Sequence, residues 1–429
     1  MSIQNSSWAG VQGSLARVGE LEYKVYLHNS GEYMSLFINE KLNFKTDNET
    51  AHRSLSNEEI NQKYVTGEFR IAAEQTRYQL PSIVEMVESG HYELNSEIQK
   101  RHRWYEDKKS QLIESFIMNV PIPPIFLFED RYSHYEVMDG LQRLTAIYEF
   151  YTNRLVLTGL GRWSELNGRK YFELPEQIKY GIDRQYLLSL ILLHETAIKS
   201  EEEAKQLKQL VLERINAGGI TPQESRSAIY NGPLNQLCRQ LSRNKYLCRT
   251  WGVPEPTTDE TKEVPKKLLE NETYQKMEDV ELVLRFFAYR QRLNYHWTSS
   301  KKYLDSFLNY GNRLPAKVLG HLEQLFNQTI ELVYDTFGEQ AFCPKNNGQW
   351  NWQSPSKTVY EPLMYVFSQH LTEAELIRQH RPTFQKRLAV LYEENQENFW
   401  KKTLLQSDMI EMNTLFENFV INIIGSSKT

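Results

Sequence analysis

The stretch YEVMDGLQRLTAIYEFY, Tyr135–Tyr151, changes its hydrophobic period at one dipeptide, Asp139-Gly140. Before the dipeptide, residues 135 and 137 alternate with 136 and 138, which is the period of a β-strand. After it, apolar and aromatic residues recur at positions 144, 147, 148 and 151, which is the period of a helix. The sequence therefore predicts a strand that ends at Asp139 and a helix that begins directly after it.

This junction has two interpretations. As a ligand site, Asp139 would bind a divalent ion or act as a base, Gly140 would let a ligand approach the backbone, and the helix N–H groups would bind an anion. Arg143 would pair with phosphate through its planar guanidinium. As a plain connection, Asp139 would cap the helix, Gly140 would supply the dihedral angles, and Arg143 would lie in solvent. The residues alone favour the connection, because Asp-Gly turns are common.

A glycine corner within ERINAGGITPQESRSAIYNG, residues 213–232, is the second candidate. Gly218-Gly219 ends one predicted helix, and residues 221–224, Thr-Pro-Gln-Glu, begin the next as a capping box. The N–H groups of this corner could hold a phosphate, with Arg226 on the first turns of the second helix. Taken alone, the corner is better explained as a connection between helices, because each residue already has a structural role.

A basic arm before Trp104 is the third candidate. It contains Gln99, Arg101, His102 and Arg103, and arginines beside an aromatic ring suit contacts to phosphate and bases. A solvated basic loop with Trp104 as an anchor in the core explains the same residues equally well.

The composition bounds the class of protein. The chain has 429 residues, of which 40% are hydrophobic and 24% charged, as in a soluble protein of two or three domains. The net charge of −5 argues against a nucleic-acid-binding protein whose whole surface is basic. It still allows a local basic patch. Three cysteines without a C-x-x-C pair indicate reduced thiols in a cytoplasmic protein. No apolar run approaches about 18 residues, so no transmembrane helix is predicted.

The order of the motifs resembles a known family. Along the chain come EIQKRHRW (97–104), LIESFIMNVPIPPIFLFE (112–129), YEVMDGLQRLTAIYEFYTNRL (135–155) and LERINAGGITPQESRSAIYNG (212–232). This series is similar to the N-terminal domain of GmrSD-type restriction systems, a branch of the ParB/sulfiredoxin-like superfamily. The family hallmark is Asp-Gly-Gln-Gln-Arg followed by Leu-Thr-Ala. The resemblance covers residues from about 78 to about 370 and matches stand-alone members that carry a helical tail and no fused nuclease.

An α+β fold is what the resemblance implies, with a ParB/sulfiredoxin-like core followed by a mostly α-helical C-terminal domain. We divide the chain into an N-terminal extension with a β-hairpin (1–75), a ParB-like domain (76–250) and a helical domain (251–429). The hairpin is predicted in residues 21–42, where two aromatic, β-branched runs flank Asn29-Ser30-Gly31. Residues 1–20 are rich in Ser, Gly, Asn and Gln, and we expect them to be loose.

The resemblance also implies a site for a nucleoside triphosphate with Mg²⁺. Its catalytic residues would be Asp139, Gln142 and Arg143, with Asp139 as the metal ligand. The positions implied for nucleotide or phosphate binding are Gly140, Gln99, Arg101, Asn216, Gly218, Gly219 and Arg226. One position departs from the family pattern, because Leu141 stands where the family has glutamine. The change costs nothing if this side chain points inward, and it threatens hydrolysis if glutamine there orients water or touches the nucleotide.

Two functions follow from the resemblance. The first is a metal-dependent NTP hydrolase of a phage-defence or DNA-restriction system, with DNA nicking as an added activity. The second is a catalytically weak module that senses nucleotide or DNA and acts through a separate effector protein. Leu141, the acidic balance and the missing nuclease half favour the second. A bare scaffold for protein interactions ranks last, because the arginine-rich arm and the two helix starts would then have no use.

Overall fold

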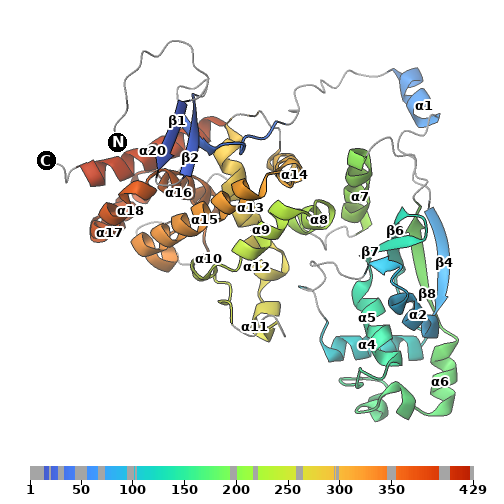
Figure 1. Ribbon diagram of the computed structural model, residues 1–429. Helices are drawn as coiled ribbons and strands as arrows, with labels where there is room; N and C mark the ends of the chain where they lie inside the picture. Colours follow the sequence, from blue (N-terminus) through green and yellow to red (C-terminus); the bar gives the residue numbers. More distant parts are fainter. Residues whose placement is uncertain are drawn as a thin grey trace. The chain divides into compact units, whose positions relative to one another are not determined.

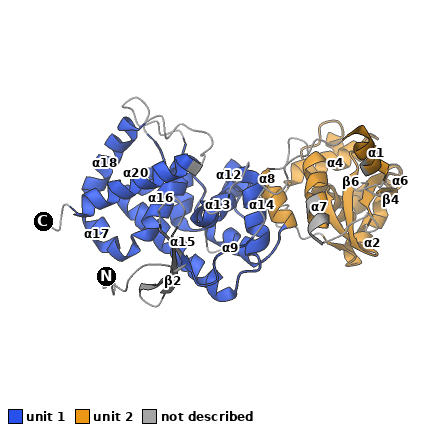
Figure 2. Cartoon of the chain, turned by 90° about the horizontal axis from the view of Figure 1, so that it is seen from above, with its two compact units in different colours: residues 1–51, 230–429 blue, residues 52–229 orange. Residues whose placement is uncertain are grey.

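The computed structural model describes residues 14–18, 21–27, 33–43, 56–65, 73–93, 101, 104–193, 201–215, 221–257, 264–293, 295, 299–344, 354–395 and 406–425. The chain divides into two compact units, which are coloured separately in Figure 2. Unit 1 comprises residues 1–51 and 230–429, and unit 2 comprises residues 52–229. Unit 2 contains all three sequence motifs that were singled out, apart from the last residues of the glycine corner.

Within its described residues, unit 2 holds a five-stranded mixed sheet in the order β4-β8-β6-β7-β5 (Figure 1). The strands are β4 (Ala73–Gln79), β5 (Tyr92–Glu93), β6 (Ile125–Arg131), β7 (His134–Asp139) and β8 (Tyr186–Leu192). Strands β4 and β8 pair antiparallel, as do β6 and β7, whereas β8 pairs parallel with β6 and β5 with β7. Parallel neighbours need long crossover connections, and here the helices of the unit supply them.

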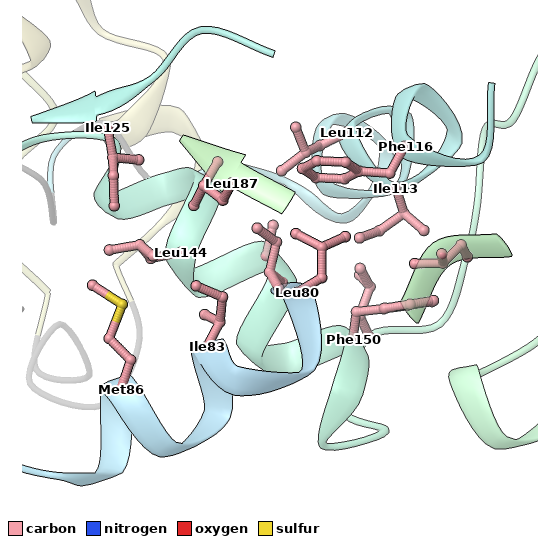
Figure 3. Close-up of a cluster of buried hydrophobic side chains, with 14 of the residues drawn as sticks. Leu80, Ile83, Met86, Leu112, Ile113, Phe116, Ile125, Leu144, Phe150 and Leu187 are labelled. Carbon is pink, nitrogen blue, oxygen red and sulfur yellow. The ribbon is translucent and has the colours of Figure 1, made fainter. Parts of the chain in front are cut away.

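Helices cover both faces of this sheet. The helical segments of unit 2 are α1 (Asn57–Val65), η2 (Leu80–Ser82), α2 (Ile83–Glu88), α4 (Glu106–Ile117), α5 (Leu141–Tyr151), η3 (Ser164–Leu166), η4 (Tyr171–Glu173), α6 (Glu176–Asp183), α7 (Glu201–Ile215) and α8 (Pro222–Ile229). Figure 3 shows apolar side chains of α2, α4 and α5 meeting Ile125 of β6 and Leu187 of β8. On the opposite face, Lys208 of α7 forms an ion pair with Glu136 of β7. Because alternate strand residues point to opposite faces, α5 and α7 lie on opposite sides of the sheet.

The residues after α5 are held to α4 by one buried carboxylate. Glu114 accepts hydrogen bonds from the backbone N–H groups of Gly161, Arg162 and Trp163 at 3.4, 2.7 and 2.8 Å. Burial by itself raises the pKa of Glu114, but the three N–H donors outweigh it and the pKa lies below its ordinary value. The carboxylate therefore stabilises this connection in its charged form.

Replacing Glu114 by glutamine is expected to lower the free energy of unfolding by about 1–3 kcal/mol at pH 7, because hydrogen bonds to a charged acceptor are lost. Since the folded-state pKa is depressed, this contribution is complete above the unfolded-state value of about 4.3 and disappears as the pH falls through the folded-state pKa. Urea denaturation at pH 7 and at acid pH measures the difference. The control is Glu165→Gln, at an exposed glutamate of η3; an equal loss in both variants contradicts the assignment.

Unit 1 is mainly helical. Its helices are α9 (Pro233–Leu241), α10 (Lys245–Trp251), α11 (Lys266–Leu269), α12 (Glu272–Gln275), α13 (Glu278–Arg292), α14 (Ser300–Gly311), α15 (Ala316–Phe337), η5 (Gly338–Gln340), α16 (Lys357–Gln369), η6 (Leu371–Glu373), α17 (Ala374–Gln379), α18 (Arg381–Glu394) and α20 (Gln406–Gly425). Strands β1 (Ser14–Val18), β2 (Leu21–Leu27) and β3 (Tyr33–Phe37) form an antiparallel sheet in that order.

The segment after β3 is tied into these helices. Arg290 of α13 donates from Nε and Nη2 to the two carboxylate oxygens of Glu40, each at 2.9 Å. Both side chains are 1% exposed. Gln291 adds a hydrogen bond to the carbonyl of Glu40 and accepts one from the N–H of Leu42, both at 3.0 Å. A segment near the start of the chain therefore belongs to the core of the unit that the C-terminal half builds.

Several expectations can be compared with this fold. The α+β class with a helical C-terminal region is confirmed, and the predicted hairpin is β2–β3. The expectation that residues 1–20 are loose is wrong for β1, which gains a full set of partners from β2. All three cysteines are free and buried. None of the helices within the described ranges has the length and apolar character needed to cross a membrane. Our three-part division of the chain stays a prediction.

Candidate functional site

The junction between β7 and α5 is a sharp turn made by one glycine. Strand β7 ends at Asp139, and α5 begins at Leu141. Gly140 lies between them with φ +100°, in the left-handed region that favours glycine. A Cβ atom at this position would lie 2.8 Å from the Cβ of Ile125 on β6 and closer still to its Cγ2. Only glycine fits here, which explains why the strand pattern and the helix pattern meet at an Asp-Gly pair.

Arg143 anchors this turn to the strand beside it. Its guanidinium forms an ion pair with Asp139 and donates hydrogen bonds to the carbonyls of Pro123 and Pro124, the latter at 3.1 Å. The Arg143 side chain is 11% exposed and that of Asp139 is 33% exposed. The plain-connection interpretation placed Arg143 in solvent, and this is wrong, because the two carbonyls just before β6 give it partners in the turn.

The acid of the turn has a position suited to a ligand. The plain-connection interpretation also expected Asp139 to cap α5, but Gly140 is the N-cap residue and no side chain caps the helix. The carboxylate of Asp139 is therefore held by Arg143 at the end of β7, one third exposed, beside the first turn of α5. The first turn of a helix presents N–H groups that bind anions. Acid, arginine and helix start thus meet at one corner of unit 2.

Gln142 brings the basic arm to the same corner. Its side-chain oxygen accepts a hydrogen bond from the backbone N–H of Trp104 at 3.0 Å. Trp104 packs against the hydrophobic core, and the ammonium of Lys108 lies 5.0 Å from its ring centroid. The anchor role for Trp104 is therefore correct. Arg101 is buried, with 6% exposed, and Gln99 lies outside the described residues.

Leu141 points into the core. It is 9% exposed and belongs to the hydrophobic cluster between the sheet and helices α2, α4 and α5. The departure from the family pattern therefore places an apolar side chain among apolar neighbours. A glutamine in the same orientation would not reach a ligand on the surface of the turn, so Leu141 carries no argument against hydrolysis.

The glycine corner is described only in part. Asn216, Gly218 and Gly219 lie outside the described residues. The capping box is confirmed, because the Glu224 N–H donates to the Thr221 hydroxyl at 3.2 Å and the Thr221 N–H donates to the Glu224 carboxylate at 2.6 Å. These bonds begin α8, which packs on α7.

Arg226 lies on α8 and is 1% exposed. It donates to the side-chain oxygen of Gln223 within the same helix. The neighbouring Ser225 is fully buried. Burial of a short helix with this polar sequence was not predicted, because nothing in its hydrophobic pattern distinguishes it from an exposed helix.

Asp139 supplies one carboxylate of the kind that a magnesium ion shared with a ligand would require, and Arg143 is its ion-pair partner. Within the described ranges, no group of three or more His, Cys, Asp or Glu side chains is placed to hold a metal. Mg²⁺ commonly keeps several waters and binds one or two carboxylates together with substrate phosphates. A single accessible carboxylate such as Asp139 meets that requirement when a nucleotide supplies the remaining oxygens.

Two features that shape the turn, a pair of backbone carbonyls and one isoleucine side chain, were not predicted from the sequence. The carbonyls of Pro123 and Pro124 hold Arg143, and Ile125 excludes any side chain at position 140. The sequence Pro-Ile-Pro-Pro before β6 could have indicated that backbone carbonyls here are left for other partners. Proline has no N–H to donate, and its extended neighbours present their carbonyls to other partners.

Comparison with known proteins bears on the same part of the chain. Residues 80–231 match the family model described as GmrSD restriction endonuclease, N-terminal domain. No curated protein and no solved structure matches the chain. The matched segment begins at η2 and includes the basic arm, the β7–α5 turn and α8. Residues 80–231 are therefore similar to the N-terminal domain of the GmrSD restriction endonuclease.

Proposed function

We propose that unit 2 is a ParB-like domain that binds and hydrolyses a nucleoside triphosphate with Mg²⁺, as part of a DNA-restriction or phage-defence system. The observation that carries the proposal is the corner at the β7–α5 turn. There, one accessible carboxylate, Asp139, is oriented by Arg143 beside a helix start that no side chain caps. The match to a restriction endonuclease domain over the same residues supports the proposal.

Each group at the corner has a separate task in this proposal. The N–H groups at the start of α5 donate hydrogen bonds to a phosphate oxygen, and the helix dipole adds to the attraction. Asp139 would hold the metal ion, which would supply positive charge to the phosphate oxygens. Arg143 positions the Asp139 carboxylate and adds positive charge nearby. Gln142 keeps the basic arm against the turn through its hydrogen bond to Trp104.

Asp139→Asn is expected to weaken the binding of nucleotide with Mg²⁺ at least about tenfold, because one unit of charge on the metal ligand is lost, which amounts to about 1.4 kcal/mol or more. Calorimetric titration with ATP, GTP, CTP and UTP measures the effect and identifies the base. The matched control is Glu136→Gln, which removes the other ion-paired carboxylate of β7 on the face toward Lys208. Binding of none of the four nucleotides by the unmodified protein contradicts the proposal, as does equal weakening in both variants.

A binding module that acts through an effector protein is the second candidate. The observation that favours it is the engagement of Arg143 by Asp139 and two carbonyls, which suits a positioning residue better than a group that meets a transition state. The two candidates separate in a phosphate-release assay. A hydrolase releases phosphate in the presence of Mg²⁺, whereas the module binds nucleotide and releases none until a partner is added.

A further inference from the structure

The chain between α5 and β8 forms a small lobe with an unusual surface. We define the basic–aromatic lobe as residues 152–186, which include η3, η4 and α6. Both views place α6 at the end of unit 2 away from α7 (Figures 1 and 2). The lobe has six basic and four acidic residues, whereas the whole chain carries a net charge of −5. Its charge balance is therefore opposite to that of the rest of the protein.

Large aromatic side chains stand exposed on this lobe. The exposed fractions are 59% for Phe172, 59% for Tyr180, 49% for Tyr186 and 38% for Trp163. Single exposed apolar residues are ordinary, but several large ones in one short segment indicate an interaction surface.

Basic groups gather around Phe172. The ammonium of Lys179 donates to the carbonyl of Phe172 at 2.6 Å, and the guanidinium of Arg169 donates to the carbonyl of Glu173 at 3.4 Å. The N–H of Phe172 donates to the side chain of Asn153 at 2.9 Å, which holds the Phe172 backbone against the end of α5. Two cations therefore bind the backbone on either side of one exposed aromatic residue.

The acidic side chains of the lobe are used within it. Glu173 accepts from the N–H of Lys170 at 2.8 Å, and Glu176 accepts from the hydroxyl of Tyr180 at 2.7 Å. Asp183 accepts from the hydroxyls of Tyr151 and Tyr171 at 3.0 and 2.9 Å. Three of the four carboxylates thus accept hydrogen bonds from groups of the lobe or of the end of α5, and the basic residues outnumber the acidic ones at its surface.

These bonds also make the surface rigid. Burial, followed by the hydrogen bond to Asp183, raises the pKa of Tyr171 to about 12, so its hydroxyl remains a donor at any physiological pH. Glu114 fixes the backbone on both sides of Arg162, next to Trp163. Aromatic rings on a rigid backbone lose little conformational entropy when they bind, which favours their use in recognition.

We propose that the basic–aromatic lobe binds a single-stranded stretch of DNA. Bases stack on Phe172 and on the other exposed aromatic rings of the lobe, and Arg169 and Lys179 contact the phosphates. The bases must be unpaired, because a duplex buries base faces within its own stack. The choice of DNA over RNA rests on the proposed role of unit 2 in a restriction system, whereas the binding surface itself is argued from the lobe alone.

Fluorescence anisotropy of the full chain with labelled oligo-dT tests the proposal. Phe172→Ala is expected to weaken binding about fivefold to a hundredfold, the range that one stacked base contributes. Phe172→Trp should retain most of the affinity, because it keeps a stacking ring. Tyr132→Ala is the control, since Tyr132 is 69% exposed in the β6–β7 turn, outside the lobe.

Salt dependence provides the second measurement. Substituting Arg169 and Lys179 by alanine together should flatten the slope of log affinity against log salt by about 1.4, since each phosphate contact on a single strand contributes about 0.7. Circular dichroism shows whether each variant is folded, and Phe172→Leu replaces Phe172→Ala if the latter is not. Nucleotide titration on the same proteins keeps the two proposals separate, because the lobe variants should bind nucleotide as the unmodified protein does.

Four outcomes overturn the proposal. The first is an equal loss of oligo-dT affinity in Tyr132→Ala and Phe172→Ala, and the second is an unchanged slope of log affinity against log salt in the Arg169 and Lys179 double variant. The third is tighter binding of duplex DNA than of oligo-dT, and the fourth is tighter binding of oligo-U than of oligo-dT. The first two are expected if the lobe binds a protein partner, because substitutions in it would then leave the binding of oligo-dT unaffected. A groove for duplex DNA or for RNA would give the third or the fourth.

Discussion

Gly140→Ala is expected to lower the free energy of unfolding of unit 2 by about 2–6 kcal/mol. Two costs add. Alanine must adopt φ near +100°, which L residues rarely do, and this costs about 1–3 kcal/mol. Its Cβ must also displace Ile125, whose Cβ lies only 2.8 Å away, and overpacking of this kind costs about 1–3 kcal/mol more. Ile125 cannot yield easily, because it is fully buried in the central strand of the sheet.

A second glycine separates these two costs. Gly90 follows α2 with φ +73°, and a Cβ there would meet no atom within 4 Å. Gly90→Ala therefore carries only the backbone cost. Urea denaturation measures the loss of unfolding free energy in each variant, and the difference between the two losses is the cost of the steric overlap with Ile125. Equal losses would mean that Ile125 does not restrict position 140. The turn would then owe its shape to the backbone preference of glycine only.

Arg290→Met is expected to destabilise unit 1 by about 3–5 kcal/mol, because it leaves the carboxylate of Glu40 buried without its cation. The two side chains share a pair of hydrogen bonds of 2.9 Å and are each 1% exposed. Arg290 also lies over the ring of Phe37, with 5.6 Å between its guanidinium carbon and the ring centroid. Loss of the arginine thus weakens the link between the segment after β3 and α13.

An exposed ion pair in the same unit is the control for this prediction. Lys276 and Glu272 are 3.0 Å apart on the surface of unit 1, with side chains that are 49% and 80% exposed. Lys276→Met is expected to change the free energy of unfolding by at most about 0.5 kcal/mol, since water already screens the pair. Thermal or urea denaturation measures both variants. Comparable effects at the two positions would show that the Glu40–Arg290 pair is solvated in solution.

Local patterns were enough to predict the parts of the site that depend on near neighbours. The change of period at Asp139-Gly140 gave both ends of the turn, and the Thr-x-x-Glu spacing at 221–224 gave the capping box. Both features involve groups within four residues of one another. Backbone geometry alone brings such groups together, so their spacing in the sequence is sufficient evidence.

Contacts between residues far apart in the sequence could not be predicted from those local patterns. Arg143 meets the carbonyl of Pro123, 20 residues earlier, and Arg290 meets Glu40, 250 residues earlier. Strand β4 is mostly exposed and reads as an ordinary polar segment, AEQTRYQ, until β8 pairs with it. The basic–aromatic lobe was also missed, because the sequence does not show which of its aromatic rings are exposed and which are buried.

The sequence by itself determined the similarity of residues 80–231 to the GmrSD N-terminal domain, the α+β class, the β2–β3 hairpin and the position of the turn at Asp139. These depend on short-range spacing and on the kinds of residue present. The tertiary structure decided what each charged group does. It buried Leu141 and Arg226, paired Arg143 with Asp139, and gave three acids of the lobe hydrogen-bond donors within their own segment or from the end of α5. The physical reason is that the effect of a charge depends on its burial and on its partners, and only the folded chain specifies both.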